Sequence, residues 1–147
     1  MKSLDEILSL IPHRPPFLWV DEIISFDGNT IITEKTIPDD LDILAGHYPG
    51  NPIMPGVLLC EAIFQTGALF IGKMAQSKKS NEHTLPVLTR ISNAKFKRSV
   101  LPGNTVQIKV RLSENLSSVC FFRGKLTIEG KTAVQVDFAC TMSDSIA

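Results

Sequence analysis

The chain has 147 residues, 44% of them hydrophobic, so it is long enough to bury a core and too short for two ordinary domains. We therefore expect a single domain over residues 1–147. Its 15 basic side chains balance its 15 acidic ones, which argues against the basic surface that a nucleic-acid partner requires. The three cysteines, Cys60, Cys120 and Cys140, are widely spaced and favour a reduced, cytoplasmic setting.

Neither end of the chain nor its apolar run predicts a membrane segment. Asp5 and Glu6 stand where a signal peptide would have its apolar run. The longest apolar stretch contains Glu61 and Gln65 and falls short of the roughly 20 residues needed to cross a bilayer. We expect a protein that is neither secreted nor membrane-spanning.

The first half of the chain predicts a short helix, a hairpin and a long helix. The short helix begins at Ser3 and ends before Pro12. Residues 17–26 and 30–36 are expected to be strands, because the Asp-Gly-Asn sequence between them suits a tight reversal. After a loop rich in Asp and Pro, residues 55–74 are apolar nearly all round, which predicts a helix buried on every side.

The second half predicts strands. Residues 73–83 are polar and form a solvated connection, and residues 86–100 form an extended segment. Residues 106–112 alternate with period two, as expected for a sheet with one wet face, and residues 119–128 and 132–141 form a further hairpin. The predicted fold class is α+β, with one antiparallel sheet wrapped around a long central helix.

The candidate site is the segment that runs from His47-Tyr48-Pro49-Gly50 to Pro55-Gly56 and on to Glu61. Pro55 suits a first helical position, and Gly56 has no Cβ to keep a ligand from the unpaired N–H groups there. A carbonyl oxygen is expected to dock at that end. Glu61 lies in the second turn among apolar neighbours that offer no cation, so it is expected to be buried, unpaired and able to donate a proton.

This segment resembles the β-hydroxyacyl-acyl-carrier-protein dehydratases of the FabZ type, which carry a His-aromatic-Pro-Gly loop, then Pro-Met-Pro-Gly and a helix with an acid. The similarity extends upstream to residues 10–21 and downstream to residues 94–103. It therefore covers nearly the whole chain. The resemblance implies the hotdog fold. It also implies elimination of water from (3R)-hydroxyacyl thioesters carried by acyl carrier protein, in fatty-acid synthesis.

The resemblance also implies a role for each site residue. His47 takes the proton at C2, Glu61 protonates the C3 hydroxyl, and the Gly56 N–H binds the thioester oxygen, while Tyr48 shapes the loop. In the family the base and the acid meet across a two-fold dimer interface, so we expect an obligatory homodimer, with a trimer of dimers as a further assembly. Glu at position 61 matches the branch that only dehydrates, whereas the isomerising branch has Asp.

Three other residues have two interpretations each. Gln65 lies one turn after Glu61, where its amide suits a hydrogen bond to that carboxylate or to a strand backbone. Phe64 suits the wall of an acyl tunnel or ordinary core packing. His13 belongs to the similar opening segment, but the simpler interpretation is a turn residue, and we assign it no chemistry.

The only local excess of positive charge is formed by Lys95, Lys97 and Arg98, together with Arg90. This cluster is either a wet strand face or the docking surface for an acidic acyl carrier protein. The histidines and cysteines lack metal-ligand spacing, and no phosphate loop appears, so we expect no metal and no cofactor. Two rival functions remain open: a hotdog thioesterase and a non-catalytic subunit that binds acyl carrier protein.

Overall fold

A computed structural model of the chain describes residues 3–78 and 85–143. It has three helices and six strands in these ranges, and their arrangement confirms the predicted fold class. The elements in chain order are α1 (Ser3–Leu10), β1 (Glu22–Phe26), β2 (Thr30–Thr36), α2 (Asp42–Gly46), α3 (Gly56–Ser77), β3 (Leu85–Phe96), β4 (Thr105–Leu116), β5 (Val119–Ile128) and β6 (Lys131–Ser143).

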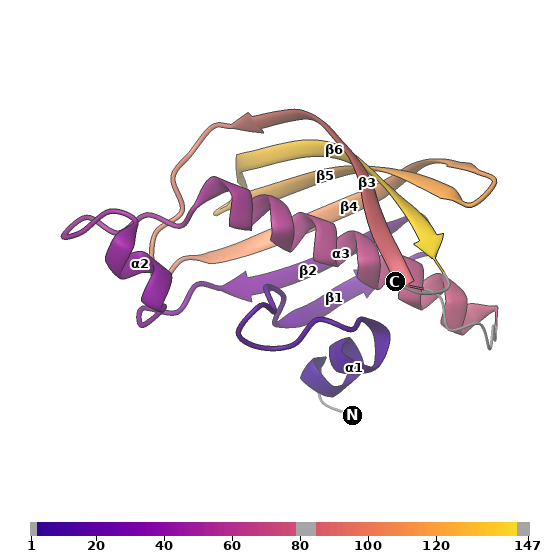
Figure 1. Cartoon of the computed structure of the whole chain (residues 1–147), viewed down its shortest axis with the longest axis horizontal. Helices are drawn as coiled ribbons and strands as arrows, with labels where there is room; N and C mark the ends of the chain where they lie inside the picture. The colour runs from indigo at the N-terminus through magenta and orange to yellow at the C-terminus, as the bar shows by residue number, and fades with distance from the viewer. Residues whose placement is uncertain (1–2, 79–84, 144–147) are drawn as a thin grey trace.

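The six strands form one antiparallel sheet in the order β1-β2-β4-β5-β6-β3. The sheet curves around α3, as Figure 1 shows, and α3 contacts β2, β4, β5, β6 and β3. Strand β3 follows α3 in the chain and pairs with the last strand, β6, so it lies at one edge of the sheet. Its other side has no neighbouring strand among the described residues.

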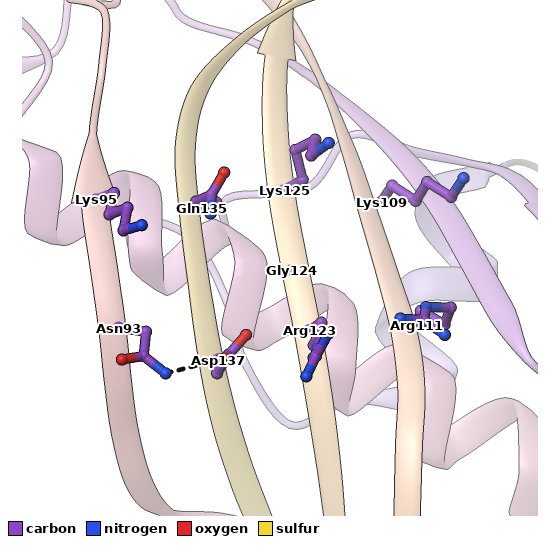
Figure 2. Close-up of a pocket in the computed structure, with 9 residues that line it drawn as sticks. All are labelled: Asn93, Lys95, Lys109, Arg111, Arg123, Gly124, Lys125, Gln135 and Asp137. Carbon is purple, nitrogen blue, oxygen red and sulfur yellow. Dashed lines mark hydrogen bonds between the residues drawn. The ribbon is translucent and has the colours of Figure 1, made fainter.

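The two faces of the sheet differ because the side chains of β4 alternate. Val106, Ile108 and Val110 point to α3 and are fully buried. Lys109 and Arg111 are exposed, and Figure 2 shows them on the outer face. The period-two pattern of the sequence thus separates an apolar inner face from a charged outer one.

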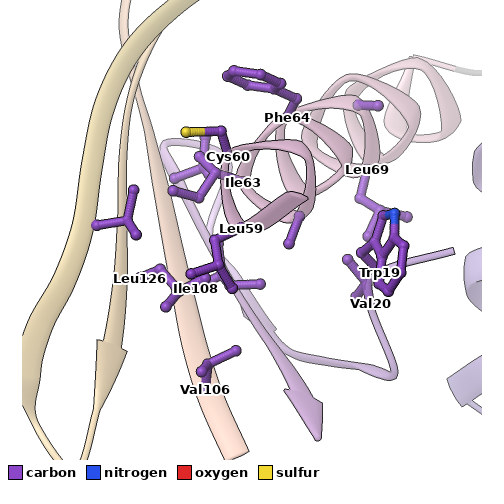
Figure 3. Packing of buried hydrophobic residues seen from close by; sticks show 14 of the residues in the cluster. Trp19, Val20, Leu59, Cys60, Ile63, Phe64, Leu69, Val106, Ile108 and Leu126 are labelled. Carbon is purple, nitrogen blue, oxygen red and sulfur yellow. The ribbon is translucent and has the colours of Figure 1, made fainter. Parts of the chain in front are cut away.

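The core lies between α3 and the inner face of the sheet, where Leu59 and Ile63 pack near Ile108 and Leu126 (Figure 3). The burial of α3 runs without a break from Ala62 to Ile71. By length and hydropathy α3 could cross a membrane, but 67% of its most apolar window is buried in this core. Its apolar character is therefore explained by the sheet and the N-terminal segment that cover it.

The predicted bounds differ from the structure at several strand ends: β3 ends at Phe96 and not at residue 100, and β4 continues to Leu116 and not to residue 112. Three further differences concern the elements around α3. The first strand begins at Glu22 and not at residue 17, because the backbone of Phe17 and Trp19 bonds to a side chain of α3 in place of a strand. The short helix α2 occurs in the loop where we expected no element. The helix α3 continues to Ser77, and the remainder of the predicted connection over residues 73–83 lies largely outside the described residues.

Gly124 on β5 sets how closely α3 approaches the sheet. A Cβ at this position would overlap Cγ2 of Ile63. We expect Gly124→Ala to lower the free energy of unfolding by about 1–3 kcal/mol, the usual cost of overpacking a core. The matched control is Gly46→Ala, whose new Cβ would meet nothing within 4 Å. Urea unfolding of both variants measures the difference.

A double variant tests whether the overlap with Ile63 causes the loss of stability in Gly124→Ala. In Gly124→Ala/Ile63→Ala the overlap is removed, so the double variant should lose less unfolding free energy than the sum of the losses in the two single variants. A Gly124→Ala protein as stable as Gly46→Ala would show that α3 can move away from β5 without cost.

Candidate active site

The start of α3 is a backbone site with free N–H groups. Met54 N–H donates to the Val100 carbonyl at 2.8 Å, which ties the segment before the helix to the segment after β3. Pro55 is the residue before the helix, one position earlier than predicted, and its carbonyl accepts from Leu58 and Leu59. The N–H of Gly56 has no hydrogen-bond partner among the described residues. It can therefore bind an oxygen with partial negative charge.

The ring of Phe96 covers Gly56. A Cβ at residue 56 would lie 2.8 Å from Cε1 of Phe96. Gly56 is thus needed so that this ring, which is 55% exposed, can lie against the first turn of α3. Our expectation that the missing Cβ leaves room for a ligand is incomplete, because the space at that position is taken by the ring of Phe96.

His47 follows α2 and is held in one tautomer. Its Nδ1 lies 2.8 Å from the Ile53 carbonyl oxygen, and the Ile53 N–H donates to the His47 carbonyl at 2.9 Å. A carbonyl can only accept, so Nδ1 carries a proton, and in the neutral imidazole Nε2 keeps its lone pair. The imidazole also stacks on Tyr48 at 4.5 Å between ring centroids. This geometry suits a general base that acts through Nε2.

Glu61 lies in the second turn of α3 and has two polar neighbours. Gln65 Nε2 donates to Glu61 Oε2 at 3.0 Å, and His13 Nε2 lies 3.7 Å from the same oxygen. The carboxyl side chain is 23% exposed. The expectation of a buried carboxylate without a partner is therefore wrong, because the segment before β1 folds over α3 and brings His13 to it.

Gln65 is fully buried and makes the predicted bond to Glu61, and its side-chain bonds to the backbone go to the irregular segment before β1 and not to a strand. Its Oε1 accepts from the Trp19 N–H at 2.8 Å, so the other terminal atom must be the amide nitrogen. That nitrogen donates to the Phe17 carbonyl and to Glu61, each at 3.0 Å. Gln65 thus fixes the carboxyl group of Glu61 and the path of the N-terminal segment at once.

His13 is the residue that the sequence analysis missed. Its Nδ1 is buried and has no hydrogen-bond partner among the described residues. Burial lowers the pKa of His13 below its ordinary value, and Arg14 contributes in the same direction, although Glu61 opposes both. No spacing rule links positions 13 and 61, so this contact could not be predicted from the sequence.

No hydrogen bond joins His47 to Glu61 among the described residues. His47 is held by Ile53, and Glu61 is held by Gln65 and His13. The structure thus presents the candidate base and the candidate acid as two separately supported groups on either side of the start of α3.

The remaining candidate residues lie at two places. Phe64 is 9% exposed and packs on Phe138, with ring centroids 5.0 Å apart, so it is part of the core. Lys95, Lys97 and Arg98 are exposed at the end of β3 and just after it, and Lys95 directly precedes Phe96 in the chain. The basic residues therefore adjoin the segment that covers Gly56.

A family model described as a FabA-like domain matches residues 11–137. This match covers most of the chain, so the chain belongs to the FabA-like family. Two curated relatives are named 3-hydroxyacyl-(acyl-carrier-protein) dehydratase FabZ. The protein from Rickettsia massiliae (strain Mtu5) is 38% identical over 143 residues, and that from Rickettsia rickettsii (strain Sheila Smith) is 37% identical over 143 residues; each alignment covers 97% of both chains.

Solved structures share the fold at low sequence identity. The dehydratase heterocomplex ApeI:P from Xenorhabdus doucetiae aligns with a TM-score of 0.80 and 17% identity, over 92% of this chain and 89% of that chain. A hypothetical thioesterase with coenzyme A from Streptococcus pneumoniae TIGR4 aligns with a TM-score of 0.65 and 14% identity, over 86% and 90%. The fold is the hotdog fold, as the resemblance implied.

The pKa of His13 leads to a prediction about stability and pH. Because burial lowers the pKa of His13 from 6.5 in the folded protein, the unfolded chain protonates His13 at a higher pH than the folded protein does. The stability that neutral His13 provides is complete above pH 6.5 and is lost as the pH falls toward the folded pKa. We expect the wild type to lose more unfolding free energy than His13→Gln between pH 7.5 and pH 5.5 in urea titrations. Parallel pH profiles for the two proteins would contradict this.

Proposed function

We propose that this protein is a (3R)-hydroxyacyl-acyl-carrier-protein dehydratase, which eliminates water from β-hydroxyacyl thioesters to give trans-2-enoyl thioesters in fatty-acid synthesis. The similarity to curated dehydratases over 97% of the chain supports this assignment. The observation that carries it in the structure is His47, whose Nδ1 bond to Ile53 leaves Nε2 free as a base beside the start of α3. We take residues 1–147 as one dehydratase domain that acts in the cytoplasm.

In the proposed reaction, His47 Nε2 removes the proton from C2 and Glu61 gives a proton to the C3 hydroxyl. The C2–H and C3–O bonds break, a double bond forms between C2 and C3, and water leaves. The Gly56 N–H, at the positive end of α3, binds the thioester oxygen as charge develops there. His47 ends protonated and Glu61 ionised, and solvent exchange restores both.

Gln65 determines which oxygen of Glu61 carries the proton. Its amide N–H donates to Oε2, so Oε2 acts as an acceptor and the acidic proton belongs on Oε1. A carboxyl group held in this way presents its proton in one direction, as efficient proton transfer requires. Tyr48, stacked on the imidazole, and Pro55, before the helix, keep the base and the oxyanion site in place.

The proposed enzyme is a homodimer with sites shared between subunits, which assemble further into a trimer of dimers. Strand β3 supports the dimer, because it is a 12-residue edge strand with exposed Leu88, Ile91 and Phe96. A long edge with apolar side chains is a template for pairing with another chain. Pairing of two β3 strands would bury these side chains and place the start of one α3 near the second subunit.

A thioesterase is the alternative hotdog activity. It would direct water at the thioester carbonyl and release a free acid. The similar thioesterase structure is only 14% identical, whereas the dehydratase relatives reach 38%. The held tautomer of His47 also favours proton abstraction, because a thioesterase needs no base in this loop. Formation of the enoyl thioester, and not of free acid, from purified protein and β-hydroxyacyl substrate decides between the two.

We predict that His47→Ala and Glu61→Gln each lower the rate of dehydration by at least ~10²-fold, the scale of general acid-base catalysis. Enoyl formation is followed spectroscopically, and circular dichroism verifies the fold. Glu61→Gln keeps the size of the side chain and an acceptor for Gln65, so its loss reports on the proton. Near wild-type turnover in either folded variant would refute the assignment of these two residues.

Mixing the two inactive variants tests the shared site. In a heterodimer, one site combines both substitutions and the other combines the two unmodified residues. After random subunit exchange, activity should recover to about a quarter of the wild-type value, given the two-fold symmetry of the dimer. Absence of recovery after verified exchange would mean that each chain builds its own site.

We also propose that Phe64 limits the acyl tunnel. Its ring packs on Phe138, so truncation opens volume on the side of α3 that faces β6. Phe64→Ala is expected to shift the preference toward longer acyl chains and to cost about 3–5 kcal/mol of stability. The activity profile over graded chain lengths must be measured where the variant is folded. An unchanged profile would show that Phe64 serves only to pack the core.

Lys95, Lys97 and Arg98 are proposed to dock the acidic carrier protein near Phe96. Reversal of charge in Lys97→Glu/Arg98→Glu should raise KM for carrier-linked substrate several-fold, because rim charges act mainly on association. Coenzyme A thioesters should react unchanged, since they need no docking. Lys131→Glu, at the exposed first residue of β6, is the control for a change of charge away from the cluster. Equal losses with both substrates would assign the cluster to the fold.

A further inference from the structure

The outer face of the sheet carries a hollow with a strong positive charge. Its volume is about 530 Å³. The side chains that form it come from β3, β4, β5 and β6 and stand on the face turned away from α3 (Figure 2). We call this surface the basic sheet face; it consists of Lys95, Lys109, Arg111, Arg123 and Lys125, with Asn93, Gln135, Asp137 and the backbone of Gly124.

The strand register places like charges directly opposite each other. Lys109 pairs with Lys125, and Arg111 pairs with Arg123, in neighbouring positions of β4 and β5. Like charges directly across two strands are destabilising. The sheet therefore assembles five of the chain's 15 basic residues on one face, although the net charge of the chain is zero. This arrangement opposes folding unless a negative charge occupies the face.

The protein neutralises only part of this charge, because Asp27 is close enough to Lys109 for their charges to interact, and no ion pair forms with the other cations among the described residues. Asp137 is the only carboxylate among the described residues that lines the hollow, and it lies opposite Arg123 in the register of β5 and β6. Its Oδ2 accepts a hydrogen bond from Asn93 at 3.0 Å. The ion pairs found among residues 3–78 and 85–143 all involve other side chains. The cations of the basic sheet face are therefore available to an external anion.

The lining indicates the chemistry of that anion. All the side chains around the hollow are charged or carry an amide, and none is aromatic or aliphatic. An acyl chain would find no apolar side chain to pack on, and a protein partner would find no apolar anchor of the kind that dominates protein interfaces. Two arginines and two lysines in adjacent strands, about 4.8 Å apart, instead match several phosphate groups held close together.

We propose that the basic sheet face binds a small anion that carries two or more linked phosphates. Arg111 and Arg123 bind phosphate oxygens through their paired N–H groups, and Lys109 and Lys125 neutralise the next phosphate along. The site is separate from the candidate acid, because its side chains stand on the sheet face turned away from α3, the helix that carries Glu61; it shares only Lys95 with the proposed carrier-docking cluster. It does not depend on the proposed function.

The test uses sodium tripolyphosphate as the probe, with inorganic phosphate and sulfate at equal ionic strength for comparison. Isothermal titration calorimetry should show tripolyphosphate binding at least tenfold more tightly than either single anion. Arg123→Gln/Lys125→Gln should weaken this binding by at least tenfold. Lys97→Gln/Lys131→Gln removes the same charge outside the hollow and should change it less than twofold. Lys109→Gln/Arg111→Gln repeats the test on β4 if the first variant does not fold.

Thermal unfolding provides a second test, because the variant should be more stable than the wild type without ligand and should be stabilised less than the wild type by tripolyphosphate. Without ligand, Arg123→Gln/Lys125→Gln should unfold at a higher temperature than the wild type, because two like-charge pairs are removed. With tripolyphosphate, the wild type should gain stability and the variant should not. The proposal is overturned if tripolyphosphate binds no more tightly than sulfate, if the control variant loses as much affinity, or if only an acidic protein binds this face.

Discussion

The buried amide of Gln65 is the interaction on which the candidate site depends. A primary amide in a core is costly unless its donors and acceptor are satisfied. Here its oxygen accepts from Trp19, and its nitrogen donates to Phe17 and to Glu61. The amide of Gln65 provides hydrogen-bond partners for the backbone of Phe17 and Trp19, in place of a neighbouring strand. A single side chain thus closes the N-terminal segment over α3 and orients the proposed acid.

Glycine at two positions permits the packing that places Gln65. A Cβ at Gly67 would lie 2.6 Å from the ring of Phe138, and one at Gly124 would overlap Ile63. These glycines let α3 approach the inner face closely enough to be buried from Ala62 to Ile71. Because the helix is covered by the sheet on one side and by the N-terminal segment on another, its polar residues must find partners within the protein. For Gln65 these partners include Glu61, the proposed acid.

Much of the fold could be predicted from local patterns. The alternation in β4, the hairpin turn after Phe26 and the apolar run of α3 are all properties of neighbouring residues, and the structure has elements at each place. The motif around His47 was also visible, because proline restricts the backbone locally and glycine permits conformations that other residues avoid. The contact of His13 with Glu61 was not, since it joins positions 48 apart through the packing of an irregular segment. For the same reason the prediction of a strand over residues 17–20 is wrong: Leu18, Trp19 and Val20 are buried, but the Trp19 N–H and the Phe17 carbonyl bond to Gln65 in place of a strand.

The environment of Glu61 follows from this packing and has a chemical consequence. An acid that must both give and regain a proton needs neighbours that do not fix it permanently as an anion. Arg14, beside His13 in the sequence, is a cation that would fix Glu61 as an anion if the two were paired. Its guanidinium instead donates to the carbonyls of Leu8, Ile11 and His13 and forms no ion pair with Glu61 among the described residues. The group that does approach is His13, and burial lowers its pKa so that it stays neutral at pH 7. A neutral imidazole and a neutral amide orient the carboxyl group without pairing it with a full charge. The N-terminal segment therefore holds Glu61 in place without setting a cation beside it.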